Sequence, residues 1–266
     1  MAESLEIASY GQGLPLVFIH GWGLNSGVWQ PTIDCLADQF EIITVDLPGF
    51  GTNVNNTCQP YQLENIANAI VASIDKPAVY IGWSLGGLVC SQIALAHPQQ
   101  SLGLITVSSS PCFIEKENES AHWPGIKSHL LAGFHRQLAE DIQKTLDGFL
   151  RIQAMGSPHL RQDIKQIRNL VMQYPLPSRA TLDDSLALLE TVDLRNQLAQ
   201  ISVPFLRLYG RLDSLVPKTI PTLVTELHPK SDQHIFTKAS HAPFISHFDE
   251  FISVLTQWLK NSTKAK

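Results

Sequence analysis

Short apolar runs that end in turn residues recur along the chain, and segments with a helical pattern lie between several of them. The apolar runs cover residues 14–19, 41–46, 78–81, 102–107, 204–209 and 233–236. Nearly continuous apolar runs of this length are typical of strands that a parallel sheet buries on both faces. The helical patterns cover residues 61–74, 85–97, 217–227 and 249–260. This alternation predicts an α/β fold with a doubly wound, mostly parallel sheet.

One long segment breaks the alternation. From about Phe113 to Glu190 no run reads as a strand, and helical patterns follow one another instead. They cover residues 125–138, 139–153, 158–173 and 181–189, with proline-containing breaks between them. We therefore predict a core formed by residues 1–112 and 191–266 and an inserted all-helical cap, or lid, formed by residues 113–190. Because ligands bind at the carboxyl ends of strands in such sheets, we expect the cap to cover that edge.

The composition argues against several classes of partner. The chain has 266 residues and a net charge of −5, so no basic field favours nucleic acid. No apolar run approaches the roughly 18–20 residues that cross a bilayer, and the acidic start does not resemble a signal peptide. The four cysteines are scattered and form no Cys-x-x-Cys, which predicts reduced thiols and no metal site. We expect a cytoplasmic protein with no nucleic-acid or membrane partner.

The strongest chemical signal is a serine between glycines at the end of the third apolar run. Gly82-Trp83-Ser84-Leu85-Gly86 joins a predicted strand to a predicted helix. This Gly-x-Ser-x-Gly pattern is typical of the nucleophile elbow, a sharp turn that presents the serine hydroxyl above a sheet. Glycine-rich turns also match the pattern by chance, but here the strand and the helix supply the context that an elbow needs. Ser84 is therefore the candidate nucleophile.

A serine nucleophile needs a base and an acid that orients the base, and in this fold they follow in the order Ser, Asp or Glu, His. Asp213 lies in the turn after the fifth apolar run, and His241 follows the last one. Both come after strands, at the edge where Ser84 is expected. The alternatives are Asp193, which precedes its strand, for the acid, and His234, within a strand, or His247, at a helix start, for the base.

The oxyanion that forms during attack on an ester needs preorganised donors. One is expected to be the backbone N–H of Leu85, directly after the nucleophile, and the other to come from an early loop. That loop is His20-Gly21-Trp22-Gly23, which makes Trp22 the candidate. The indole of Trp22 is expected either to line an acyl pocket or to belong to the core. Asp46, in a Pro-Gly-rich segment, is interpreted as part of a structural turn.

The predicted cap combines an apolar stretch with basic residues. Phe149, Leu150 and Ile152 are expected to form an apolar ceiling over the nucleophile. The cations nearby are Lys144, Arg151, Arg161, Lys165 and Arg168. The last three are spaced i, i+4, i+7 and so share one helix face. This face is either an ordinary solvated surface or a landing patch for an acidic partner or a phosphate.

Seven segments spread over nearly the whole chain carry a resemblance to a known family. They are residues 20–25, 45–51, 82–89, 109–113, 123–127, 205–210 and 241–247. The chain resembles the α/β-hydrolases and, more closely, the pimeloyl-[acyl-carrier protein] methyl ester esterases of biotin synthesis. Most of these motifs are widely shared among α/β-hydrolases. Trp83, beside the nucleophile, and Trp123-Pro124-Gly125-Ile126-Lys127, at the start of the cap, are more distinctive.

The resemblance implies a monomeric enzyme without cofactor that hydrolyses the methyl ester of pimeloyl-acyl carrier protein and releases methanol. It implies a triad of Ser84, Asp213 and His241. It also implies substrate contacts from Trp22, Ser84, Leu85, Phe149, Leu150, Arg151, Ile152, Gln153 and His241.

The family's cap also carries arginines that meet the acidic carrier protein. Docking is accordingly expected of Lys144, Arg161, Lys165 and Arg168. Arg161 matches the family pattern, whereas Lys144 and Lys165 keep only the charge and lack the bidentate fork of arginine. Gly148 departs from the pattern, because a basic residue is expected there.

Two other functions remain open. The first is another capped serine hydrolase, such as a general short-chain carboxylesterase or a hydrolase of carbon–carbon bonds. Activity on carrier-bound compared with free substrates separates it from the esterase of biotin synthesis. The second is a non-catalytic ligand-binding protein on this fold, which would not need to keep all three triad residues.

Overall fold

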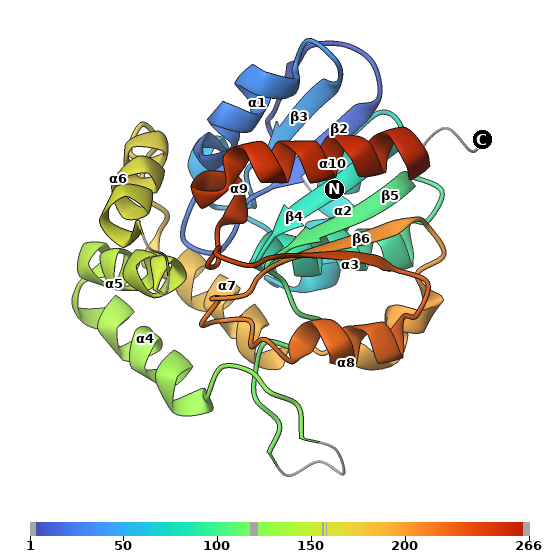
Figure 1. The fold of residues 1–266 in the computed structure, drawn as a ribbon. Helices are drawn as coiled ribbons and strands as arrows, with labels where there is room; N and C mark the ends of the chain where they lie inside the picture. The colour runs from blue at the N-terminus through green and yellow to red at the C-terminus, as the bar shows by residue number, and fades with distance from the viewer. Residues whose placement is uncertain (1–3, 118–121, 156, 158, 263–266) are drawn as a thin grey trace.

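The computed structural model describes residues 4–117, 122–155, 157 and 159–262. Within these ranges the strands form one seven-stranded sheet in the order β1-β3-β2-β4-β5-β6-β7 (Figure 1). Their bounds are β1 (Ile7–Tyr10), β2 (Pro15–Ile19), β3 (Glu41–Val45), β4 (Ala78–Trp83), β5 (Ser101–Val107), β6 (Phe205–Gly210) and β7 (Asp232–Phe236). β1 runs antiparallel to β3, and every other neighbouring pair is parallel. The predicted α/β fold with a mostly parallel sheet is confirmed.

The six predicted strands correspond to β2–β7, and β1 is a seventh that the sequence did not reveal. β1 pairs only with β3, at the edge of the sheet, and its side chains are mostly exposed. An exposed edge strand needs no apolar run, so the pattern that marked the other strands is absent from it.

Helices cover both faces of the sheet and make a separate core on each. Their bounds are α1 (Gln30–Leu36), α2 (Leu63–Ser73), α3 (Leu85–Ala96), α8 (Ile220–Leu227), α9 (Pro243–Ser246) and α10 (Phe248–Ser262), with 3₁₀ turns η1 (Ser26–Trp29), η2 (Gly51–Asn53) and η3 (Arg195–Gln200). Val17 and Ile19 of β2 pack in the core with α2, α3 and α8. Leu16 and Phe18 point to the other face, toward α1 and α10. The alternation of a strand's side chains thus anchors helices on both sides.

The segment between β5 and β6 supplies the helical insertion. It contains α4 (Ser128–Glu140), α5 (Ile142–Ala154), α6 (Leu160–Val171) and α7 (Arg179–Thr191), and α4–α6 lie to one side of the sheet in Figure 1. Among the described residues before α4, isolated bridges link Cys112 to Asp193, Ile114 to Ile126 and Lys116 to Trp123. We refer to α4–α7 as the cap. Within the described ranges, no helix combines the length and the apolar character that a bilayer crossing demands.

Candidate active site

Ser84 occupies a strained turn between β4 and α3. Its φ of 55° lies in the left-handed region, which a residue with a side chain rarely adopts. A Cβ on Gly82 would collide with the Gly86 carbonyl, and one on Gly86 would meet the Ile19 carbonyl oxygen at 2.5 Å. Both glycines are therefore needed for β4, α3 and β2 to approach so closely. The result is the strand–turn–helix geometry of a nucleophile elbow.

Asp213 and His241 are held together in loops that follow β6 and β7. Nδ1 of His241 lies 2.8 Å from Oδ2 of Asp213, and the two side chains are 0% and 1% exposed. The other carboxylate oxygen accepts from the N–H groups of Leu215, at 2.8 Å, and Val216, at 3.1 Å. With Nδ1–H donating to the carboxylate, Nε2 of His241 is the proton acceptor, and it is buried without a hydrogen-bond partner among the described residues.

The loop of His241 is fastened beside the serine turn. The indole Nε1 of Trp83, the residue before Ser84, donates to the His241 carbonyl at 2.8 Å. The two rings lie with their centroids 5.7 Å apart. The structure thus brings the predicted acid and base together next to the predicted nucleophile.

The alternative acid and bases are engaged elsewhere. The Asp193 carboxylate binds the guanidinium of Arg195, with Nη2 2.6 Å from Oδ2. His234 pairs with Glu250 at 3.0 Å, and Nδ1 of His247 bonds the Ser246 hydroxyl at 2.9 Å.

Two main-chain N–H groups beside Ser84 are available for an oxyanion. Leu85 is the first residue of α3, where N–H groups lack intrahelical acceptors. Trp22 lies after β2, whose Ile19 is paired with Gly82 of β4. Across the described chain, no hydrogen bond uses either N–H. The indole of Trp22 is fully buried, donates to the Leu182 carbonyl at 3.1 Å and packs edge-on against Phe149 at 4.7 Å.

His20 shapes the loop that carries Trp22, a role that the sequence did not reveal. Its Nδ1 lies 2.8 Å from the Gly21 carbonyl, and its Nε2 accepts from the N–H of Leu47 at 3.0 Å. Asp46, the residue before Leu47, accepts from the main-chain N–H groups of Ser26 and Thr52. The interpretation of Asp46 as a turn residue agrees with these bonds. In the sequence, His20 stands directly after a predicted strand, at the start of the loop that carries Trp22.

Acidification is expected to destabilise the fold through His20. Burial lowers the pKa of His20 below 6.5, although Asp46 opposes the shift. Below about pH 6.5 the unfolded chain therefore binds a proton that the folded chain does not, and the free energy of unfolding falls. Urea unfolding between about pH 7.5 and about pH 5.5 should show a smaller fall in a His20→Gln variant than in the wild type. Equal falls in the two proteins would contradict this assignment.

α5 turns four of its five predicted substrate contacts toward the interior. Phe149 and Leu150 are buried, Ile152 is half-buried, and Gln153 is fully buried. Both amide atoms of Gln153, Nε2 and Oε1, have no hydrogen-bond partner among the described residues. Arg151 differs, because its side chain is exposed on the outer surface of the helix. The structure does not gather Arg151 with the others.

Two surface hollows flank α5. The larger, of about 670 Å³, lies between α4, α5 and the loop after Asp213, and its lining includes Phe134, Ile152 and Leu215. The smaller, of about 60 Å³, lies between α5, α6 and the loop after Trp22, and its lining includes Leu150 and Arg168. The predicted apolar ceiling thus forms walls of two different hollows.

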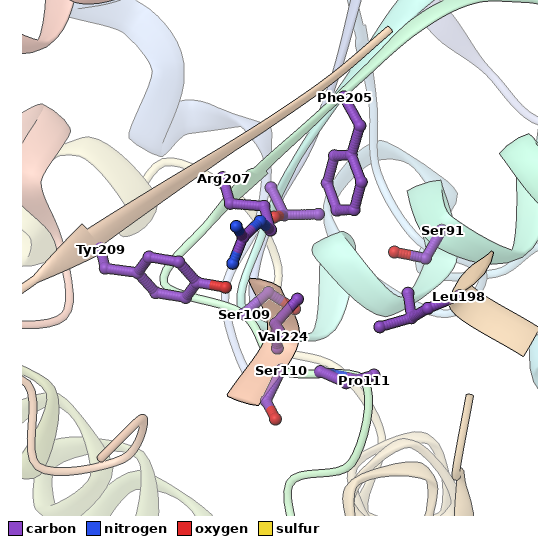
Figure 2. Close-up of a pocket in the computed structure, with 10 residues that line it drawn as sticks. Ser91, Ser109, Ser110, Pro111, Leu198, Phe205, Arg207, Tyr209 and Val224 are labelled. Carbon is purple, nitrogen blue, oxygen red and sulfur yellow. The ribbon is translucent and has the colours of Figure 1, made fainter. Parts of the chain in front are cut away.

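A third cavity has both polar and apolar lining residues (Figure 2). Its lining includes Ser109, Arg207 and Tyr209, and the Ser109 hydroxyl donates to the Ser84 carbonyl at 2.8 Å. Its volume of about 10 Å³ is that of about one water molecule, so an acyl chain must be held elsewhere. Among the described residues, no group of three or more His, Cys, Asp or Glu side chains is placed to hold a metal ion.

The predicted docking cations differ in how far they are neutralised. Lys144, at the start of α5, and Arg161 and Lys165, on α6, are exposed and form no ion pair within the described ranges. Arg168 is different, because its Nη2 lies 3.6 Å from Oδ2 of Asp147 on α5. Three of the four cations thus have no ion pair with any residue that the structure describes.

Comparison with known proteins identifies the family. The family model for the alpha/beta hydrolase fold matches residues 15–248. The pimeloyl-[acyl-carrier protein] methyl ester esterase of Aeromonas hydrophila is 46% identical over 256 residues, which cover 96% of this chain and 99% of that protein. The chain belongs to the pimeloyl-[acyl-carrier protein] methyl ester esterase family. A second esterase of this name, from Shewanella woodyi, is 46% identical over 97% of this chain and 99% of its own.

Solved structures of more distant proteins share the fold of this esterase family member. An esterase from Exiguobacterium antarcticum gives a TM-score of 0.83 at 22% identity and covers 96% of this chain and 95% of its own. A bromoperoxidase from Bacillus anthracis gives 0.83 at 20% identity, covering 96% and 94%. At such identities the likeness shows the fold alone.

Proposed function

We propose that this protein hydrolyses the methyl ester of pimeloyl-acyl carrier protein to methanol and pimeloyl-acyl carrier protein, a step of biotin synthesis in the cytoplasm. One observation carries the proposal. Nε2 of His241 is held free by Asp213 beside the Ser84 turn, in a chain whose relatives of that name align over almost its whole length.

The proposed mechanism uses the triad twice. His241 Nε2 takes the proton of the Ser84 hydroxyl as its oxygen attacks the ester carbonyl, and the N–H groups of Leu85 and Trp22 stabilise the oxyanion. The imidazolium then protonates the leaving methoxide, which departs as methanol and leaves the acyl group on Ser84. His241 next activates water to release the acid. Asp213 orients the imidazole throughout, and no step needs a metal or an organic cofactor.

The hollow between α4 and α5 suits the acyl chain. Most of its surface is apolar, and its volume of about 670 Å³ is within the range of small-molecule sites. It reaches Ile152 and Leu215, which neighbour Gln153 and Asp213 in sequence. Gln153 has a donor and an acceptor to offer, and a buried amide without partners is costly unless a ligand satisfies it. We therefore propose that Gln153 contacts a polar group of the substrate.

The unpaired cations of the cap support docking of the acidic carrier protein. Exposed charges without partners need not break an ion pair in order to meet a carboxylate or a phosphate. Lys144, Arg161 and Lys165 have this character, whereas Arg168 would first have to leave Asp147. We expect the first three to contribute more to docking than Arg168.

Reversing one of these charges should weaken activity on the carrier-bound ester only. For Arg161→Glu, we expect kcat/KM on pimeloyl-acyl carrier protein methyl ester to fall about tenfold at low salt, because repulsion replaces attraction. The loss should shrink as salt screens the charges. Hydrolysis of p-nitrophenyl butyrate should stay within about twofold of wild type, since no long-range steering is involved. Steady-state kinetics on both esters at low and high salt make the measurement.

Arg179→Glu is the matched control, since Arg179 is an exposed arginine of the cap that pairs with Asp183. It should leave both activities near the wild-type values. If Arg161→Glu and Arg179→Glu have equal effects, the docking patch is wrong. If the wild type cleaves only the free ester, the protein is a general carboxylesterase and the biotin-pathway assignment fails.

A further inference from the structure

The C-terminal end of α5 is hydrogen-bonded to both loops that carry the proposed acid and base. The Ser214 hydroxyl donates to the Ile152 carbonyl at 3.1 Å. The Ser240 hydroxyl lies 2.7 Å from the Gln153 carbonyl and 2.8 Å from that of Met155. The main-chain N–H of His241 donates to the Gln153 carbonyl at 3.2 Å. We call these four bonds the latch.

The latch joins parts of the molecule that are far apart in sequence. Ser240 and Gln153 are separated by 87 positions, and Ser214 and Ile152 by 62. The last carbonyls of a helix lack the usual i+4 donors, so they can accept from another element; the Ile152 carbonyl accepts from the Met155 N–H as well, at 3.1 Å. The two serines directly adjoin Asp213 and His241 in the chain. These hydrogen bonds join the C-terminal end of α5 to the loops that carry Asp213 and His241.

Ser240 is the central member of this arrangement. It is 2% exposed, and its single O–H hydrogen is shared between the Gln153 and Met155 carbonyls in a three-centre hydrogen bond. Its main chain lies close against the end of β6, because a Cβ on Gly210 would collide with the Ser240 carbonyl. The loop of Ser240 therefore packs against the sheet on one side, and its hydroxyl bonds α5 on the other.

We propose that Ser240 is a positioning residue that, with Ser214, keeps the Gln153 end of α5 against the His241 loop. It touches neither the ester nor the reacting atoms. It acts by fixing the spacing between the Gln153 amide, which meets the acyl substrate, and the His241 imidazole, which moves the proton. This inference rests on the proposed function of the site.

Kinetics of Ser240→Ala provide the first test. The variant loses the bonds to the Gln153 and Met155 carbonyls, and we expect kcat/KM on pimeloyl-acyl carrier protein methyl ester to fall on the order of tenfold, mainly through KM. A short ester such as p-nitrophenyl acetate does not extend along α5, so its loss should be no more than about threefold. Ser246→Ala is the matched control, because that hydroxyl lies in the same region and bonds only locally, to Ala242 and His247.

Hydrogen exchange provides the second test and separates the latch from the substrate assignment. In Ser240→Ala, amides of residues 149–155 should exchange faster than in wild type, while those of α3 do not change; Ser214→Ala should show the same pattern more weakly. Unchanged exchange in α5, or equal losses on the two esters, would overturn the latch. If the wild type fails to cleave the carrier-bound ester but α5 exchange rises in Ser240→Ala, the latch stands and the proposed substrate fails.

Discussion

Replacing Ser84 with alanine is expected to lower kcat for the carrier-bound methyl ester by about a millionfold, close to the residual rate that binding and oxyanion donors alone support. Ser84 lies in a turn with a strained φ of 55°, and the residue before it, Trp83, is hydrogen-bonded to His241, whose Nε2 has no partner among the described residues. Alanine keeps the backbone and leaves the base nothing to deprotonate. Methanol release measured over long incubations, together with labelling by a serine-directed phosphonate, tests this expectation.

Ser91→Ala controls for the loss of a hydroxyl near the turn. Ser91 lies on α3, the helix that follows Ser84, and its hydroxyl donates to the Gly87 carbonyl at 2.7 Å. This variant should keep nearly full activity and full phosphonate labelling. If Ser84→Ala retained more than about one per cent of the wild-type rate, another residue would have to be the nucleophile.

Asp213→Asn is expected to lower kcat by about ten-thousandfold while leaving the protein folded. Asparagine can keep an oxygen for the N–H groups of Leu215 and Val216. It loses the anionic acceptor that lies 2.8 Å from Nδ1 of His241. Without that carboxylate, the imidazole is no longer held with Nε2 free, and the imidazolium that forms during attack is not stabilised. Kinetics on the carrier-bound ester, with circular dichroism as a check on folding, make the measurement.

Asp193→Asn is the control, because Asp193 is the other acid that the sequence allowed. Its carboxylate binds Arg195, so its loss should affect stability modestly and leave kcat within a few-fold of wild type. A larger loss of kcat in Asp193→Asn than in Asp213→Asn would show that Asp193, and not Asp213, is the acid.

Variants of the core residues Ser84 and Asp213 are expected to affect activity differently from variants of the cap. Ser84, Asp213 and His241, the proposed triad, all lie in turns that follow strands of the sheet, and we expect their loss to remove the chemistry for every ester. Arg161 and Gln153 lie on helices of the insertion. We expect changes there to alter which ester is bound and how well it is placed. The two esters used above therefore separate chemistry from recognition.

Much of the fold could be predicted from the sequence, because its signals are local. The buried strands β2–β6 carry nearly continuous apolar runs, which predict them. β7 is mostly exposed but ends in Ile235 and Phe236, whereas β1 is mostly exposed and carries no such run. The sequence predicts the elbow because its two glycines are required by close backbone contacts. Gly82 lies against Gly86, and Gly86 lies against β2. Asp213 and His241 each follow a predicted strand, which makes them the candidate acid and base, and the structure places their side chains in contact.

The sequence by itself determined the parallel sheet, the helical insertion and the short set of residues able to act as nucleophile, acid and base, because periodicity and turn chemistry operate over a few neighbouring positions. Only the tertiary structure decided that Arg151 faces solvent, that Asp147 pairs with Arg168, and that Ser240 binds the end of α5. Such contacts depend on how separate elements pack. Ser240 and Gln153 are 87 positions apart, so no local sequence pattern predicts that they meet. Packing between separate elements therefore decides which local candidates meet.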